Sequence, residues 1–191
     1  MNGAPGGRAL AIAIYDRPPG APFIDETEAY KRKTRPELRW RPGNDPWGVQ
    51  TFQVFMDGVQ IGQTTGSTLV PATPLTTGRH TWQVESVDRA GQASRSRVRT
   101  LKIDATPPTL KVKVSGRRAA GRSLKISVTA RDKGGSGLDH VTVDYGDKSA
   151  KTQTRTTRHR YKRGKFTLKV AAVDKAGNVT RKQTKLTIKK S

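Results

Sequence analysis

"GRHTWQVESVDRAGQASR" (residues 78–95) and "GKFTLKVAAVDKAGNVTR" (residues 164–181) are two nearly matching stretches of one chain. Aligned without gaps, they agree at eight of eighteen positions, all in one register. Each alternates apolar and polar residues as far as an aspartate and then reaches an Ala-Gly pair. That order is typical of a β-strand entering a tight turn. The chain therefore uses one structural unit twice.

The repeated aspartate and glycine have an expected role in this turn. Asp88 and Asp174 are placed to accept hydrogen bonds from turn amides. Gly91 and Gly177 can adopt the positive φ that tight turns often require. Both copies are thus expected to solve the same backbone problem with the same residues.

Strand signals surround both copies. Before the first copy, "ELRW" (37–40) reads as a short strand, and "TFQVFMDGVQIGQTT" (51–65) as a hairpin turning at Asp57-Gly58. Trp40 and Trp82 fall on inward positions. Strands recur every 8–12 residues around the second copy as well. The sequence predicts an all-β fold of two tandem immunoglobulin-like antiparallel sandwiches joined by a short Pro-rich linker.

The boundaries follow from proline-rich joints. "KIDATPPTLKV" (102–112) and "DRPPGAPF" (16–23) each read as a stiff, extended segment. We predict modules at 18–104 and 105–191, with residues 1–17 as the last strand or tail of a preceding domain. The strand-like "ALAIAIYD" (9–16) could alternatively be the first strand of the first module.

Composition excludes several classes of protein. The 191 residues contain no cysteine, which rules out disulfides, thiolate metal sites and a cysteine nucleophile. No apolar run is long enough to span a membrane, and the N-terminus does not read as a signal peptide. Charge is strongly asymmetric: residues 1–104 carry 14 Lys/Arg against 10 Asp/Glu (+4), and residues 105–191 carry 23 against 5 (+18). Any electrostatic function belongs to the second half.

Catalytic chemistry is not indicated. His80 is expected to pack at a corner, His140 to lie on the surface and His159 to be structural. Ser136 in "GGSG" lacks the strand-to-helix context of a nucleophile elbow. The chain is predicted not to be an enzyme and to hold no cofactor. Five aspartates of the second half could approach one another, but we expect turn caps rather than a metal site, since calcium takes six to eight oxygen ligands. They are Asp132, Asp139, Asp144, Asp147 and Asp174.

The second half contains one feature that the fold alone does not require. It is the basic stretch "KSAKTQTRTTRHRYKRGK" (148–165), together with the shorter basic stretch "GRRAAGR" (116–122). Because alternate residues of a strand face outward, part of this charge should form one positive face. The candidate polyanion-binding residues are Lys148, Lys151, Arg155, Arg158, Arg160, Lys162, Arg163, Lys165, Arg117 and Arg118. Trp47 is a weaker candidate for stacking against a carbohydrate. The same cations could instead protect strand edges from pairing.

Two family resemblances accompany these patterns. "PELRWRP", "FQVFMDG" and "PLTTGRHTWQVESVDRAGQAS" resemble a fibronectin type III-like domain, with His80 where that family usually has a tyrosine. "VTVDYGDKS" and "RHRYKRGKFTLKVAAVDKAGNVT" are similar to a bacterial PKD-type immunoglobulin-like domain, with Val143 and Lys148 departing from its pattern.

The resemblance implies a non-catalytic structural or adhesion module pair of a bacterial secreted or cell-surface protein. Its partners would be other domains of the parent chain and anionic polymers such as cell-wall polymer or acidic polysaccharide. The alternatives are a nucleic-acid-binding module that uses the basic face of residues 111–190, or an accessory carbohydrate-binding module of an extracellular enzyme.

Overall fold

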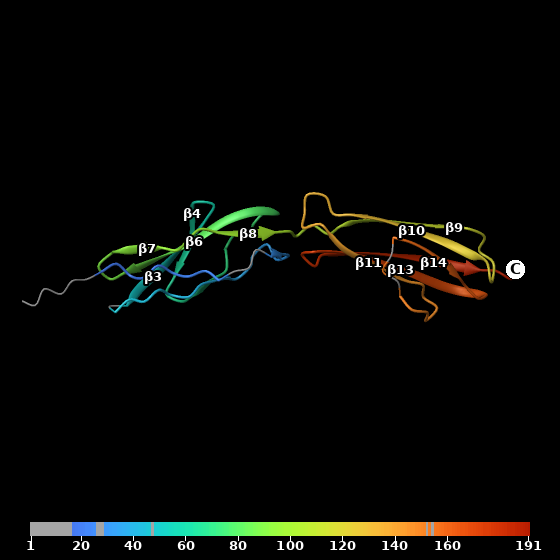
Figure 1. Ribbon diagram of the computed structural model, residues 1–191, viewed down its shortest axis with the longest axis horizontal. Coiled ribbons are helices and arrows are strands. Elements are labelled where there is room, and N and C mark those ends of the chain that lie inside the picture. Colours follow the sequence, from blue (N-terminus) through green and yellow to red (C-terminus); the bar gives the residue numbers. More distant parts are fainter. Residues whose placement is uncertain (1–16, 26–28, 47, 152, 154) are drawn as a thin grey trace, which may run out of the picture.

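The computed structural model describes residues 17–25, 29–46, 48–151, 153 and 155–191. Every regular element in these residues is a β-strand, and the strands form two sandwiches placed end to end in an elongated molecule (Figure 1). The all-β prediction is confirmed. Two sequence expectations, the strand "ALAIAIYD" and the platform at Trp47, fall outside the described residues.

The first module is built on one large sheet of order β1-β8-β6-β3-β4, with β7 also paired to β6. Two short strands, β2 and β5, form a second sheet. The strands are β1 Tyr30–Lys31, β2 Leu38–Arg39, β3 Val49–Met56, β4 Val59–Thr64, β5 Thr68–Leu69, β6 Gly78–Asp88, β7 Ala93–Arg95 and β8 Arg99–Ile103. The expected hairpin is β3–β4. It turns at Asp57 (φ 50°) and Gly58 (φ 82°), the left-handed pair of a type I′ turn.

The second module packs two three-stranded antiparallel sheets face to face, one of order β12-β10-β9 and the other β11-β13-β14. Its strands are β9 Thr109–Ser115, β10 Ser123–Arg131, β11 Leu138–Asp144, β12 Thr156–Arg160, β13 Gly164–Asp174 and β14 Val179–Ile188. Strand β12 lies in what reads in the sequence as a plain polar stretch. Its pairing with β10, rather than any apolar pattern, makes it a strand.

Each sandwich has its own core, and the two cores share no residue. In the first, Trp40 and Trp82 are 5% and 1% exposed, as their positions in the sequence predict. In the second, Leu168 and Tyr161 are among the fully buried side chains. Burial of each large aliphatic side chain stabilises its own module by about 1.5–3 kcal/mol.

The repeated turn forms as expected in both copies. Asp88 Oδ1 accepts a hydrogen bond from the Gln92 amide, and Asp174 Oδ1 accepts one from the Asn178 amide, each at 2.8 Å. Gly91 and Gly177 have φ of 81° and 87°. The two aspartates are 2% and 1% exposed, so each bond takes up part of a charge that is hidden from water; the second carboxylate oxygen of Asp88 is buried without a hydrogen-bond partner.

Separate cores predict separate unfolding. Leu101→Ala should lower the stability of the first module by about 2–5 kcal/mol, and Leu168→Ala that of the second, because each leaves a cavity in one core only. Calorimetry of the full chain should show two unfolding transitions. In each variant, the transition of the altered module should move to a lower temperature, and that of the other module should not move. Val59→Ala, at a side chain 67% exposed, is the control. A single transition that shifts equally in both core variants would contradict two independent cores.

Candidate functional site

The joint between the modules is organised by Asp104, the residue after β8, which is fully buried. Its amide donates to the Lys31 carbonyl at 2.9 Å, on the first-module side. Its carboxylate accepts from the Ser136 amide at 2.7 Å, and its carbonyl accepts from Asn178 Nδ2 at 2.8 Å, both on the second-module side. One residue is therefore hydrogen-bonded to both modules, and the joint is fixed rather than a free hinge.

The neighbouring loops close around this residue. Asn178 Nδ2 also donates to Asp174 Oδ2 at 2.9 Å, and Arg32 Nη1 of the first module donates to the Gly177 carbonyl at 3.3 Å. Ser136, which resembles a nucleophile only superficially in the sequence, accepts from the Ala176 amide through its hydroxyl at 3.0 Å. Its role in the structure is to tie the loop of residues 132–137 to the repeated turn.

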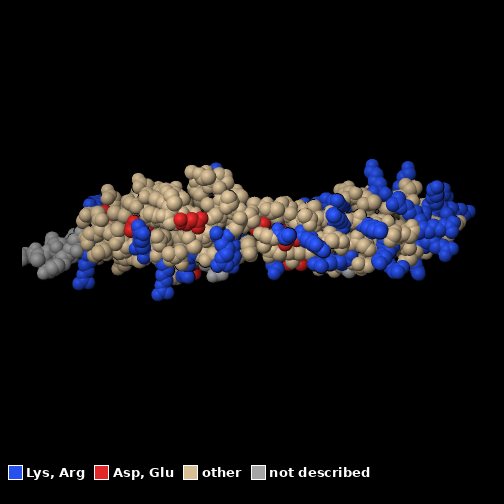
Figure 2. Space-filling model, turned by 90° about the horizontal axis from the view of Figure 1, so that it is seen from above, with Lys and Arg blue, Asp and Glu red and all other residues tan. Residues whose placement is uncertain are grey.

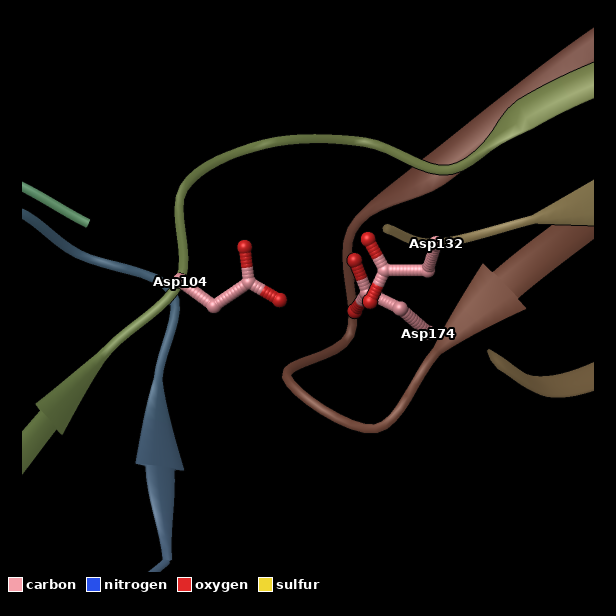
Figure 3. A group of neighbouring side chains, drawn as sticks. All are labelled: Asp104, Asp132 and Asp174. Atoms are coloured by element: carbon pink, nitrogen blue, oxygen red, sulfur yellow. The ribbon is translucent and has the colours of Figure 1, made fainter. Parts of the chain in front are cut away.

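Three carboxylates converge at this joint: Asp104, Asp132 and Asp174 (Figure 3). One oxygen of each lies within 4.8 Å of the others. Burial would raise the pKa of Asp104, but hydrogen bonds from Ser136 and Thr106 outweigh it and hold that pKa below its usual value. Burial raises the pKa of Asp132, and the charges of Asp104 and Asp174 raise it further, against the bond from the Gly137 amide.

Within the described residues, these three carboxylates are the group close enough to share a cation. They supply at most part of a calcium shell, and oxygens of each already accept N–H donors. Of the five aspartates that the sequence suggested could approach one another, the structure brings together only Asp132 and Asp174, and it adds Asp104. The sequence contained one signal for Asp104. It lies shortly before the linker prolines, just as Asp16 lies shortly before the prolines of the upstream joint. The expectation that no metal binds stays a prediction.

The joint gives a direct test of that expectation. Without a cation, Asp132→Asn should stabilise the full chain slightly at neutral pH, because a group with a raised folded pKa destabilises the fold once it is ionised. The melting temperature of wild type should be the same in a chelator and in millimolar calcium. A calcium-dependent rise in wild type that disappears in Asp132→Asn would show that the cluster holds a cation.

The basic candidates divide among different parts of the second module. Arg158 and Arg160 lie on β12, with Arg155 just before it. A second group lies in the turns at the free end of the module, where the Ala120 amide bonds to the Lys189 carbonyl: Arg117, Arg118, Lys162 and Arg163. Lys165 lies on β13 in the other sheet, and Lys148 lies in the turn after β11. Lys151 pairs with Asp144 at 3.8 Å.

The outer face of the sheet β12-β10-β9, here called the cationic face, shows a pattern that the linear reading missed. Every outward position on it is Lys, Arg, Ser or Thr. Its cations are Lys111, Lys113, Lys125, Arg131, Arg158 and Arg160. Four of these six were not among the predicted residues, because they come one at a time from alternating strands rather than from a basic run. Figure 2 shows Lys and Arg covering the far part of the second module, while acidic side chains stay over the first module and the joint.

The strand β12 is held in place from beneath by His159. Its ring stacks on Tyr145 at 3.9 Å between centroids, and its Nε2 lies 2.6 Å from Asp147 Oδ2. Because strand side chains alternate, an inward His159 turns Arg158 and Arg160 outward. Burial and the nearby charge of Asp147 raise the pKa of the adjacent Tyr161 to about 12.

The other two histidines also lie in contacts with aspartates. His80 is held between Asp57 Oδ2 at 2.7 Å and the Thr76 carbonyl at 2.9 Å, which is the expected corner role. Burial opposes protonation of His80, but these bonds raise its pKa. His140 lies beside Asp139 at 2.9 Å, with its side chain 38% exposed.

The contact of Asp147 predicts acid sensitivity. Burial opposes its ionisation, but hydrogen bonds from Ser149 and His159 lower its pKa to about 2. The ionised Asp147 and its hydrogen-bond donors should therefore stabilise the fold above pH 4, by up to about 2 kcal/mol. This contribution should be lost as the pH falls from about 4 to 2. Urea unfolding should show this loss in wild type and a flatter profile in Asp147→Asn. Asp139→Asn, at the exposed pair, is the matched control. Equal slopes in all three would contradict the role of Asp147.

Comparisons with known proteins agree with the fold. No family model matches the chain, and no curated protein sequence matches it. A solved structure of fibronectin(III)-like modules of Clostridium thermocellum CbhA is similar over 88% of this chain and 94% of its own, at 16% identity and a TM-score of 0.50. A bacterial 1.5-MDa ice-binding adhesin matches 93% of this chain and 66% of its own, at 13% identity and a TM-score of 0.49. The PKD1 domain of Vibrio anguillarum Epp matches 45% of this chain and 98% of its own, at 14% identity and a TM-score of 0.39.

These observations define the class of protein. The chain consists of tandem immunoglobulin-like β-sandwiches, the fold that it shares with the fibronectin(III)-like modules of CbhA. In the part that the structure describes, no helix is long and apolar enough to cross a membrane.

Proposed function

We propose that this chain is a non-catalytic pair of structural modules from a bacterial secreted or cell-surface protein. It spaces or presents other domains of that protein. Its first support is the joint, where Asp104 fixes two sandwiches end to end. A fixed joint holds attached domains apart, whereas a flexible linker of the same length would not define a distance.

The second module adds a contact with anionic polymers to this spacing role. This polyanion contact is supported by the way in which the net charge of +18 on residues 105–191 is arranged. One whole sheet face has no acidic residue at any outward position. The opposite outer face is mixed. There Asp144 lies across from Lys169, and Ala171, Val173 and Val179 occupy outward positions. That face also carries cations, namely Lys165, Lys169, Arg181 and Lys185, so the two faces differ in that only the cationic face lacks both acidic and apolar outward residues.

Protection of strand edges explains only part of this charge. Strands β9 and β12 are the edges of their sheet, and cations there discourage pairing with other chains. Lys125 lies on β10 between Arg158 of β12 and Ser115 of β9, so it has a paired strand on each side. Cations on a central strand protect no edge, and Lys125 lies directly opposite Arg158. Such like-charge neighbours are unfavourable unless an anion neutralises them.

A nucleic-acid-binding module is the second candidate, since the same cations would attract phosphates. Sequence reading or tight binding of single strands uses stacking on exposed aromatic rings. In the second module, Tyr145 and Tyr161 are buried, and Phe166 packs against the core. This favours a sequence-independent electrostatic contact over a nucleic-acid reader.

The proposal is tested by salt-dependent binding of the full chain. The probes are poly(glycerol phosphate), polygalacturonate, single-stranded DNA and duplex DNA, at 50 and 200 mM salt. Six or more charge contacts predict an affinity loss of about 10³-fold or more over this range. A charge-matched first-module variant should bind like wild type; it carries glutamine in place of Arg17, Lys33, Arg79 and Arg89.

Two results would contradict the proposal. Absence of binding to every polymer at 50 mM salt would remove the polyanion contact and leave only the spacer. A preference for one DNA sequence that persists at 200 mM salt would make the chain a nucleic-acid reader.

A further inference from the structure

We infer that the cationic face is a built binding surface for an extended polyol-phosphate chain, a linear polymer of phosphodiesters without bases. This rests on the proposed function, because it assumes that the second module meets a polyanion. It goes further by naming one face, a binding geometry and a ligand class. The free end of the module, which is also cationic, is excluded as the main site.

The geometry of the face is a regular grid. Along β9, Lys111 and Lys113 are two residues apart, which places them about 7 Å from each other on one side of the strand. Neighbouring strands are about 4.8 Å apart, so Arg158 and Lys125 stand side by side on β12 and β10. An extended polymer that runs along the sheet can therefore meet at least one cation in each row of paired residues.

The residues between the cations are also suited to oxyanions. Lys113 pairs across the sheet with Ser127, which pairs with Thr156. Lys111 pairs with Thr129, and Arg131 pairs with Thr109. Hydroxyl groups donate hydrogen bonds to phosphate oxygens without adding charge. The rows of Lys111 and Lys113 therefore offer a cation together with neutral donors, which is the donor set that phosphate contacts use. In the row of Arg131, the Thr109 hydroxyl already donates to the Arg131 carbonyl.

The composition of the face selects among polyanions. It has no acidic residue, so nothing on it repels a phosphate. It also has no aromatic residue at an outward position, so neither bases nor sugar rings find a stacking surface. A polymer recognised only through its charged backbone fits best. The arginines add planar, paired donors that match phosphate oxygens.

The free end of the module differs from the face in one respect that matters here. Its cations lie in turns between strands, whereas those of the face share one side of a sheet whose register is fixed by backbone bonds. Fixed spacing lowers the ordering cost of binding. At equal charge, the face should therefore hold a long polymer better than the turns do.

The experiment compares charge-matched variants of the full chain. The face variant carries glutamine in place of Lys111, Lys113, Lys125 and Arg158, and the end variant carries glutamine in place of Arg117, Arg118, Lys162 and Arg163. The first-module variant described above is the third of the set. All replaced side chains are exposed, and melting temperatures check that each variant is folded. The face variant should melt no lower than wild type, because like-charge repulsion is relieved.

The expected result is specific to the face. With poly(glycerol phosphate), the face variant should lose about tenfold or more in affinity at 50 mM salt. The slope of log affinity against log salt should fall by about 3, since each single-strand contact contributes about 0.7. For the end variant, the slope of log affinity against log salt should fall by less than half as much. In wild type, amide signals of β9, β10 and β12 should shift on titration with the polymer.

The outcomes separate this inference from the proposed function. If wild type binds no polyanion, the polyanion contact itself fails. If wild type binds but the end variant loses as much as the face variant, or the amide shifts lie in the turns, the face is wrong while the contact stands. If single-stranded DNA or polygalacturonate binds the face more tightly than poly(glycerol phosphate), the ligand class is wrong.

Discussion

The arrangement of the whole molecule depends on one buried carboxylate. Asp104 has no exposed surface, so its charge must be satisfied by protein donors, which are the amide of Ser136 in the second module and that of Thr106 in the linker. Its own amide donates to the first module, and its carbonyl receives Asn178. Separating the modules would break the bonds of Asp104 to Ser136 and Asn178 and expose its carboxylate to water. The loss of these hydrogen bonds opposes bending at the short linker.

The same joint also gives the two copies of the repeated turn different roles. Asp88 and Asp174 close the same turn with the same hydrogen bond. Only the second turn contributes to the joint between modules, because Asn178 follows Asp174 and reaches Asp104 with its amide group. In the first copy Gln92 occupies the equivalent position and bonds to Asp88 through its backbone. One turn has thus gained a contact between modules while keeping its local geometry.

The sequence predicted what is local and missed what is distant. The Asp57-Gly58 hairpin, the repeated turns and the buried Trp40 and Trp82 were predictable, because backbone preference and alternation act over a few residues. Strand β12 was not, since "TTRHR" has no apolar alternation and becomes a strand only against β10. The joint was predicted at residues 102–112, but its contacts were missed for the same reason: Asp104 bonds to residues 32 and 74 positions away. The cationic face required the register of three strands, which no basic run reveals.

Charge is neutralised in different ways at the joint and on the cationic face. At the joint, three carboxylates approach within 4.8 Å, and backbone and side-chain donors take up their charge inside the protein. On the face, cations stand beside one another with only Ser and Thr between them, so their charge is left for solvent and for ligands. Water screens such exposed repulsion to less than about 1 kcal/mol per pair, which is why the sandwich tolerates it. In the proposed contact, a polyanion would neutralise these cations and release the counterions that surround both partners, so the same repulsion would be relieved on binding.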